Sequence, residues 1–111
     1  MSQKDYLVNR IKDVLDGLRI RYIRELKFSK KRKFRFDFAI PDMKIAIECE
    51  GGIFMGKYAR HTNPMGYARD TTKYNLASLE GWKLLRYTTV TIDNAENEIA
   101  LALLPKYKND K

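Results

Sequence analysis

The sequence predicts an α/β domain in which a mixed central sheet carries helices on both faces, with elements in the order α-β-β-β-α-β-α. Three observations lead to this prediction. Apolar residues recur at helical spacing near the start of the chain, period-two alternation follows between residues 21 and 50, and a second helical pattern precedes a short apolar run at 82–87. A strand that follows a helix usually pairs parallel to an earlier strand through a crossover, so the last strand should turn an antiparallel meander into a mixed sheet.

The first helix is expected over residues 3–18. Ser2 and Asp5 have the spacing of a capping pair at its start, and Gly17 lies near its end. The apolar positions that share one helical face are Leu7, Ile11, Val14, Leu15 and Leu18. This pattern predicts an amphipathic helix packed on the sheet.

Three strands are expected next, at 21–28, 34–40 and 44–50. The last two are joined by Pro41-Asp42-Met43, a short connection in which proline sets the first turn residue. The three strands therefore form a meander.

The second half of the chain contributes a helix, a strand and a helix. Helical spacing predicts a helix over 66–80 that Gly81 ends, and the run at 82–87 reads as a strand. The last helix is expected over 94–104, with Pro105 after it.

Length and composition indicate one domain over residues 1–105, with a charged tail at 106–111. Apolar residues make up 44% of the chain, which is typical of a folded protein, yet no stretch is long enough to span a bilayer or resembles a signal peptide. A cytoplasmic location is therefore expected. A single cysteine and a single histidine exclude an internal disulfide and a structural zinc site built from these ligands.

The charge balance favours a nucleic-acid partner. Lysine and arginine number 22 against 14 acids, a formal net charge of +8. The basic residues expected to bind DNA are Lys30, Lys31, Arg32, Lys33, Arg35, Lys57, Arg60 and Arg69. Phosphate contacts from such groups give salt-dependent affinity and little sequence preference. The run 29–33 also fits a solvated hairpin tip or a targeting signal.

Three acids interrupt the apolar strands. Asp37 lies between Phe36 and Phe38, which are expected to face away from it, while Glu48 and Glu50 close the next strand and point the same way as each other. Ile45, Ile47 and Cys49 should then enter the opposite layer. Clustered carboxylates favour a cation, and oxygen ligands suit Mg²⁺, so a metal site is predicted here.

Two details bear on this metal site. Gly51 and Gly52 follow the acids directly and fit a backbone kept clear for a ligand that approaches closely. The alternative is that Glu48 and Glu50 simply pair with lysine or arginine at the surface.

Several motifs follow one another along residues 22–88. They are Arg35-Phe36-Asp37-Phe38, Ile47-Glu48-Cys49-Glu50-Gly51-Gly52, Arg60-His61-Thr62, Tyr67, Asp70-x-x-Lys73-Tyr74-Asn75 and Gly81-Trp82-x-x-Leu85-Arg86. This ordered set resembles the PD-(D/E)XK, or restriction-endonuclease-like, nuclease superfamily. The narrower resemblance is to small phage and bacterial endonuclease domains related to the very-short-patch-repair endonuclease and to homing endonucleases with a Glu, Asp, His, Asp set. It implies a bacterial or phage-infected cell as the setting.

The resemblance implies a role for each acid. Asp37 would be the central metal ligand, joined by the backbone carbonyl of Cys49, and Glu48 would be the second acid. Glu50 stands where the superfamily usually has a lysine that orients or activates the attacking water. Lys73 on the second helix is the candidate substitute, with Asp70 one turn earlier, although an exposed helical ion pair of little energetic weight is an equal alternative for these two.

The resemblance extends to two further catalytic candidates. His61, in a long loop at 51–65, would act as general base or polarise the scissile phosphate, and its pKa range suits proton transfer. It can also be a loop histidine without a role. Glu25 would be the leading Glu of the homing branch.

These residues together predict a DNA endonuclease that uses Mg²⁺, with Mn²⁺ as a substitute. Asp37 with Glu48 or Glu50 would hold the metal that lowers the pKa of its bound water. Structure-selective or weakly sequence-specific cutting is expected because so small a domain has little room for a separate recognition module. The alternative is a nucleic-acid-binding module that retains the fold without chemistry, and a homodimer stays open.

Overall fold

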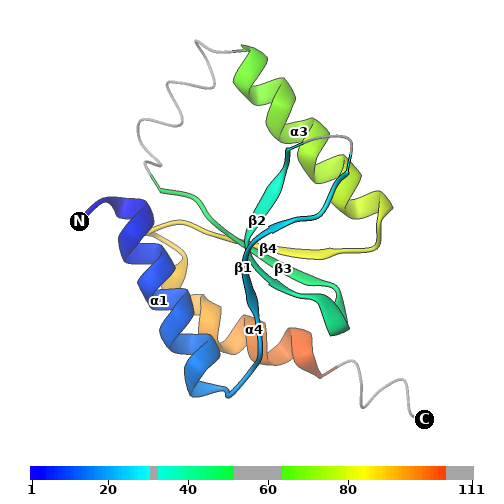
Figure 1. The fold of residues 1–111 in the computed structure, drawn as a ribbon. Helices are drawn as coiled ribbons and strands as arrows, with labels where there is room; N and C mark the ends of the chain where they lie inside the picture. Colours follow the sequence, from blue (N-terminus) through cyan, green and yellow to red (C-terminus); the bar gives the residue numbers. More distant parts are fainter. Residues whose placement is uncertain (31–32, 52–63, 105–111) are drawn as a thin grey trace.

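The computed structural model describes residues 1–30, 33–51 and 64–104, and it confirms the predicted mixed sheet and element order (Figure 1). The strands β1 (Ile23–Lys27), β2 (Arg35–Ile40), β3 (Ile45–Cys49) and β4 (Lys83–Tyr87) lie in the spatial order β1-β2-β3-β4. The first two pairings are antiparallel, whereas β3 and β4 are parallel. The meander and the parallel last strand are thus both present.

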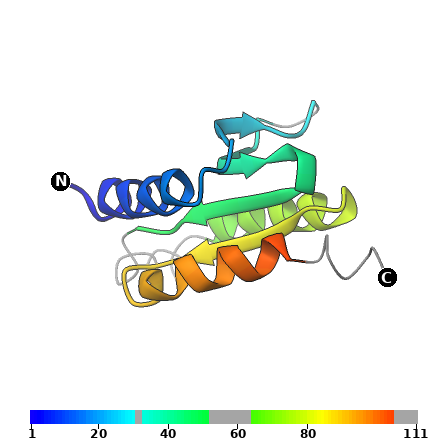
Figure 2. The same cartoon turned by 90° about the horizontal axis from the view of Figure 1, so that it is seen from below.

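Helices cover both faces of the sheet (Figures 1 and 2). Helices α1 (Gln3–Gly17) and α4 (Ala95–Leu103) lie on one face, and α3 (Pro64–Leu79) lies on the other. Helix α3 begins before the predicted residue 66, because proline is well tolerated in the first turn of a helix. The 3₁₀ turn η2 (Ile92–Asn94) leads into α4, so the α-helix itself starts one residue after the predicted boundary.

Each face of the sheet has its own apolar core. The face under α1 and α4 buries Leu7, Ile11, Leu15, Phe38, Ile40, Ile45, Ile47, Cys49, Tyr87, Ile92, Ala95, Ile99 and Ala102. The face under α3 buries Phe36, Ala39, Ala46 and Ala77, with Trp82 and Phe28 packed against them. Ile45, Ile47 and Cys49 share the first face, as the alternation of β3 predicts.

Local signals at the element ends behave as expected. Ser2 Oγ accepts a hydrogen bond from the Asp5 backbone N–H at 3.0 Å, which caps α1. Gly81 has φ +84° just after α3, a conformation that favours glycine. The predicted turn between β2 and β3 is the 3₁₀ helix η1 (Pro41–Met43), followed by Lys44 in the left-handed region.

One prediction about side-chain direction is wrong. Phe36 and Phe38 do not share a face, since Phe36 packs under α3 whereas Phe38 packs under α1. The β1–β2 ladder lacks a pairing between Glu25 and Asp37, and Glu25 has φ +56°, so strict alternation fails at this point. The side chains of β2 therefore change face at Asp37, where the candidate site begins.

No helix within the described ranges is long and apolar enough to cross a membrane. The predicted charged tail at 106–111 lies outside the described residues.

Candidate functional site

Strands β2 and β3 separate at Asp37 and Glu48, and the two carboxylates fill the fork. The ladder between the strands ends at the pair Phe38 and Ile47. At the next position the Asp37 backbone N–H donates to Glu48 Oε2 at 2.9 Å, and the Cys49 backbone N–H donates to Asp37 Oδ2 at 2.7 Å. Backbone groups that would otherwise continue the ladder thus hold both carboxylates, which are each only 6% exposed.

Two lysines from different helices meet these carboxylates. Lys4 of α1 places its Nζ 3.0 Å from Asp37 Oδ1, and Lys73 of α3 donates from Nζ to Glu48 Oε1. All four oxygens of the two acids therefore have a partner in the protein. The Lys73 side chain is only 17% exposed, so the alternative of an exposed helical ion pair does not describe it.

The surroundings raise the pKa of three groups here, for different reasons. Burial raises the pKa of Glu48 above its usual 4.5, and the Asp37 carboxylate adds to this, although Lys73 opposes it. Partial burial lowers the pKa of Lys4, but its hydrogen bond and attraction to Asp37 outweigh burial and raise the pKa overall. Burial, aided by Asp37, also raises the pKa of the Cys49 thiol to about 12.

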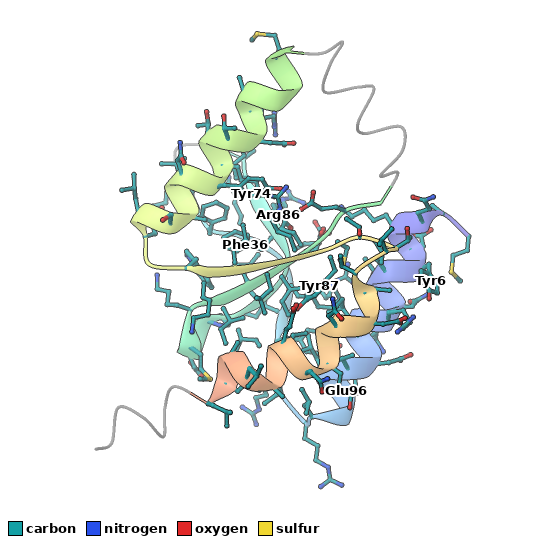
Figure 3. All side chains as sticks on the ribbon, turned by 180° about the vertical axis from the view of Figure 1, so that it is seen from behind. Tyr6, Phe36, Tyr74, Arg86, Tyr87 and Glu96 are labelled. Atoms are coloured by element: carbon teal, nitrogen blue, oxygen red, sulfur yellow. The ribbon has the colours of Figure 1, made fainter. Side chains whose placement is uncertain are left out.

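Glu50 lies beside this pair but is held by an arginine. Arg86 of β4 donates from Nε to Glu50 Oε2 and from Nη2 to Glu50 Oε1 at 3.0 Å. The Arg86 guanidinium also stacks 4.3 Å from the centre of the Tyr74 ring of α3 (Figure 3). The prediction that Glu50 shares the side of Glu48 fits this geometry, but a metal would have to compete with a two-point arginine contact.

An open pocket of about 360 Å³ lies over these residues. The predicted site residues that line it are Glu25, Arg35, Asp37, Glu48, Cys49, Glu50, Asp70 and Lys73. Lys4, Gly51 and Tyr74 complete the lining. Acidic and basic groups from β1, β2, β3, α1 and α3 thus converge on one opening.

Comparison with known proteins gives no match to a protein family, to a curated protein or to a solved structure.

The basic residues divide into three groups. Lys30 and Lys33 are exposed beside the connection between β1 and β2, and Arg35 lines the pocket. Arg69 of α3 lies 5.4 Å from the Phe34 ring centre, so α3 and this connection are neighbours. The other predicted DNA-binding residues and the predicted general base lie outside the described residues, namely Lys31, Arg32, Lys57, Arg60 and His61.

Gly51 has a different neighbour from the predicted ligand. A Cβ at this position would lie 2.6 Å from the Lys4 backbone N and 2.9 Å from its Cα. Glycine is needed because the first turn of α1 approaches the end of β3 closely. Gly52 lies outside the described residues.

The sequence prediction missed Lys4 and did not give Tyr74 or Arg86 a place in the site. A lysine in the first turn of an amphipathic helix carries no local signal of its partner. In the sequence, Tyr74 stands out only as part of a motif that carries the resemblance. Arg86 reaches Glu50 because the parallel pairing puts it directly opposite Glu48, a register that no local pattern reveals.

The donor set fits a hard divalent cation, though sparsely. Among the described residues, no group of three histidine, cysteine or acidic side chains is arranged to hold a metal. Mg²⁺ commonly takes one or two protein carboxylates and fills its remaining positions with water and substrate phosphate. Asp37 and Glu48 supply two adjacent carboxylates, and two ammonium groups already stand at their oxygens as cations. The Cys49 side chain packs under α1, so only its backbone can serve the pocket.

Proposed function

We propose that this protein is a magnesium-dependent DNA endonuclease that hydrolyses phosphodiester bonds. The observation that carries the proposal is the buried pair Asp37 and Glu48, joined through the backbone at a strand fork and open to a pocket that also contains Lys73. A surplus of basic residues gives the chain a net charge of +8, which suits a polyanionic substrate. An acid pair at a basic surface has a clear use in binding a cation that bridges protein and phosphate.

Each of these residues has its own part in the proposed hydrolysis. Asp37 and Glu48 would hold the metal together with the backbone oxygen of Cys49. When bound, Mg²⁺ supplies a Lewis acid for the phosphate and lowers the pKa of a bound water. Lys73, next to Glu48, keeps a positive charge beside the position of the attacking water.

Four predicted residues take a lesser or separate place in this proposal. A metal at Glu50 would displace two hydrogen bonds from Arg86, whereas Asp37 and Glu48 each face a single lysine, so these two acids would be the primary ligands. His61 keeps its predicted role in proton transfer. Glu25 and Asp70 line the pocket, where they would help to position substrate or water.

The substrate is expected to be DNA whose backbone rather than sequence is read. Lys30, Lys33 and Arg69 are exposed and basic, and such groups contact phosphates without distinguishing bases. Structure-selective or weakly sequence-specific cutting follows. Labelled junction, flap, nicked, mismatched and single-stranded DNA would define the preferred form.

The first test is plasmid relaxation with purified protein in Mg²⁺, in Mn²⁺ and in EDTA. Conversion of supercoiled plasmid to nicked or linear forms is expected with either metal and not with EDTA. Equal cutting in EDTA would exclude the metal-dependent mechanism.

One observation favours a second candidate, a nucleic-acid-binding module that performs no chemistry. Lys4 and Lys73 already neutralise the buried acids, so the fold has a counter-charge for them without a metal. This candidate predicts DNA binding with no cleavage of any substrate in Mg²⁺ or Mn²⁺. The same panel of substrates therefore separates the two candidates.

A further inference from the structure

Lys4 occupies an unusual position for a lysine. It lies in the first turn of α1, where the partial positive charge of the helix N-terminus disfavours a cation. Its side chain is 54% exposed, yet Nζ reaches the 8% exposed side chain of Asp37 at 3.0 Å. The lysine therefore lines the pocket from a helix end that would suit an acid better.

The backbone is shaped to bring Lys4 to this place. Gly51 follows β3, and a Cβ added to it would lie only 2.6 Å from the Lys4 backbone N, so the two backbones approach closely. This close approach is independent of the charge of the lysine side chain. It fixes the base of a long side chain at the rim of the pocket, beside the candidate metal ligand.

The two oxygens of Asp37 are not equivalent. Oδ2 accepts a hydrogen bond from the Cys49 backbone, which cannot move away without disturbing the strand fork. Oδ1 faces the ammonium of Lys4, whose side chain is half exposed. A divalent cation bound to Asp37 would therefore take Oδ1 and displace Lys4.

We propose that Lys4 is a phosphate-binding residue of this pocket that leaves Asp37 when a divalent cation binds and then contacts the DNA backbone. The inference rests on the proposed function and adds a substrate contact to it. Repulsion from the cation drives the ammonium outward, and its half-exposed chain allows the movement. The anion delivered to the pocket rim is a substrate phosphate, for which lysine is a common point-charge partner.

Lys73 does not fit the same role. Its side chain is 17% exposed and that of its partner Glu48 only 7%, so Lys73 has less freedom to follow a phosphate. The two lysines are thus expected to differ, Lys4 acting on substrate binding and Lys73 on the reaction itself.

The test compares Lys4→Gln with Lys12→Gln. Lys12 is a matched control because it lies on the same helix, has the same 54% side-chain exposure and also pairs with an aspartate, Asp16, at 3.4 Å. Both variants lose one positive charge. Lys4→Arg retains the charge and checks that any effect belongs to the cation, and circular dichroism melting establishes that all variants fold.

Two measurements are made on each protein. Calorimetry gives the Mg²⁺ affinity without DNA, and fluorescence anisotropy gives the affinity for a labelled DNA duplex in EDTA and in Ca²⁺, with a gel to verify that the DNA stays intact. Lys4→Gln is expected to bind Mg²⁺ more tightly than the parent and to match Lys12→Gln on DNA in EDTA. In Ca²⁺ it should bind DNA about fivefold to tenfold more weakly than Lys12→Gln, with a salt slope smaller by roughly one. Lys4→Arg should bind DNA like the parent.

Equal DNA affinities of Lys4→Gln and Lys12→Gln in Ca²⁺ would overturn the inference and leave Lys4 as a counter-ion of Asp37. That result is distinct from failure of the proposed function, which would appear as a parent protein that neither binds Mg²⁺ nor cuts DNA. A parent without metal binding would overturn both proposals.

Discussion

Replacement of Gly51 by alanine is expected to destabilise the protein and to disturb the candidate site together. The new Cβ would lie 2.6 Å from the Lys4 backbone N, well short of the 3.4 Å at which ordinary contact begins. The clashing atoms are backbone atoms of a capped helix, so relief requires the first turn of α1 to move from β3. Overpacking of this kind costs about 1–3 kcal/mol of unfolding free energy.

The assay is urea unfolding followed by circular dichroism, with Gly17→Ala as the control. A Cβ at Gly17, the last residue of α1, meets nothing within 4 Å. This change should leave the free energy of unfolding unchanged or raise it by up to about 1 kcal/mol. Gly51→Ala should also slow Mg²⁺-dependent cleavage, because it moves Lys4 away from the pocket rim where we place its phosphate contact. Equal free energies of unfolding for Gly51→Ala and Gly17→Ala would contradict the close approach of α1 to Gly51.

Three further predictions concern the basic surface, the helix lysine and the response to pH. Replacing Lys30 and Lys33 with Gln should weaken binding to all DNA sequences about equally and reduce the salt slope by roughly one per lost phosphate contact. A salt titration measures this slope, and an unchanged slope would show that the two lysines are solvated and do not contact phosphate. Lys73→Ala should lower turnover at saturating Mg²⁺ without weakening metal binding, and cleavage at the parental rate would leave Lys73 only an ion-pair role. Burial raises the pKa of Glu48 on folding, so the native state binds this proton more tightly than the unfolded state does. The contribution of Glu48 to the free energy of unfolding therefore falls as the pH rises above 4.5. The melting temperature of Glu48→Gln relative to that of the parent should therefore rise as the pH increases above 4.5, and a pH-independent difference would contradict the shift.

The order of the elements could be predicted because each depends on a local pattern. Helical spacing from Leu7 to Leu18 and alternation from Ile45 to Cys49 act within single elements, and both are confirmed. The prediction failed at Phe36, where alternation does not hold. Its cause, the left-handed backbone of Glu25, lies on a neighbouring strand and leaves no signature in β2 itself.

The candidate site could be predicted in part for the same reason. Asp37 and Glu48 stand out as acids inside apolar runs, and the structure brings them together at one fork. Lys4 could not be found, because its meeting with Asp37 depends on the packing of α1 against Gly51 across the fold. The pairing of Glu50 with Arg86 likewise depends on the register of a parallel strand pair.

The most direct test of the central proposal is the rate of plasmid cleavage by Asp37→Asn in saturating Mg²⁺, measured beside Asp42→Asn. Both changes remove one carboxylate charge, but Asp42 lies exposed in η1 outside the pocket. The proposal predicts that Asp37→Asn folds, binds DNA and no longer cuts, while Asp42→Asn cuts at the parental rate. Parental Mg²⁺-dependent cleavage by Asp37→Asn would contradict the proposed metal centre.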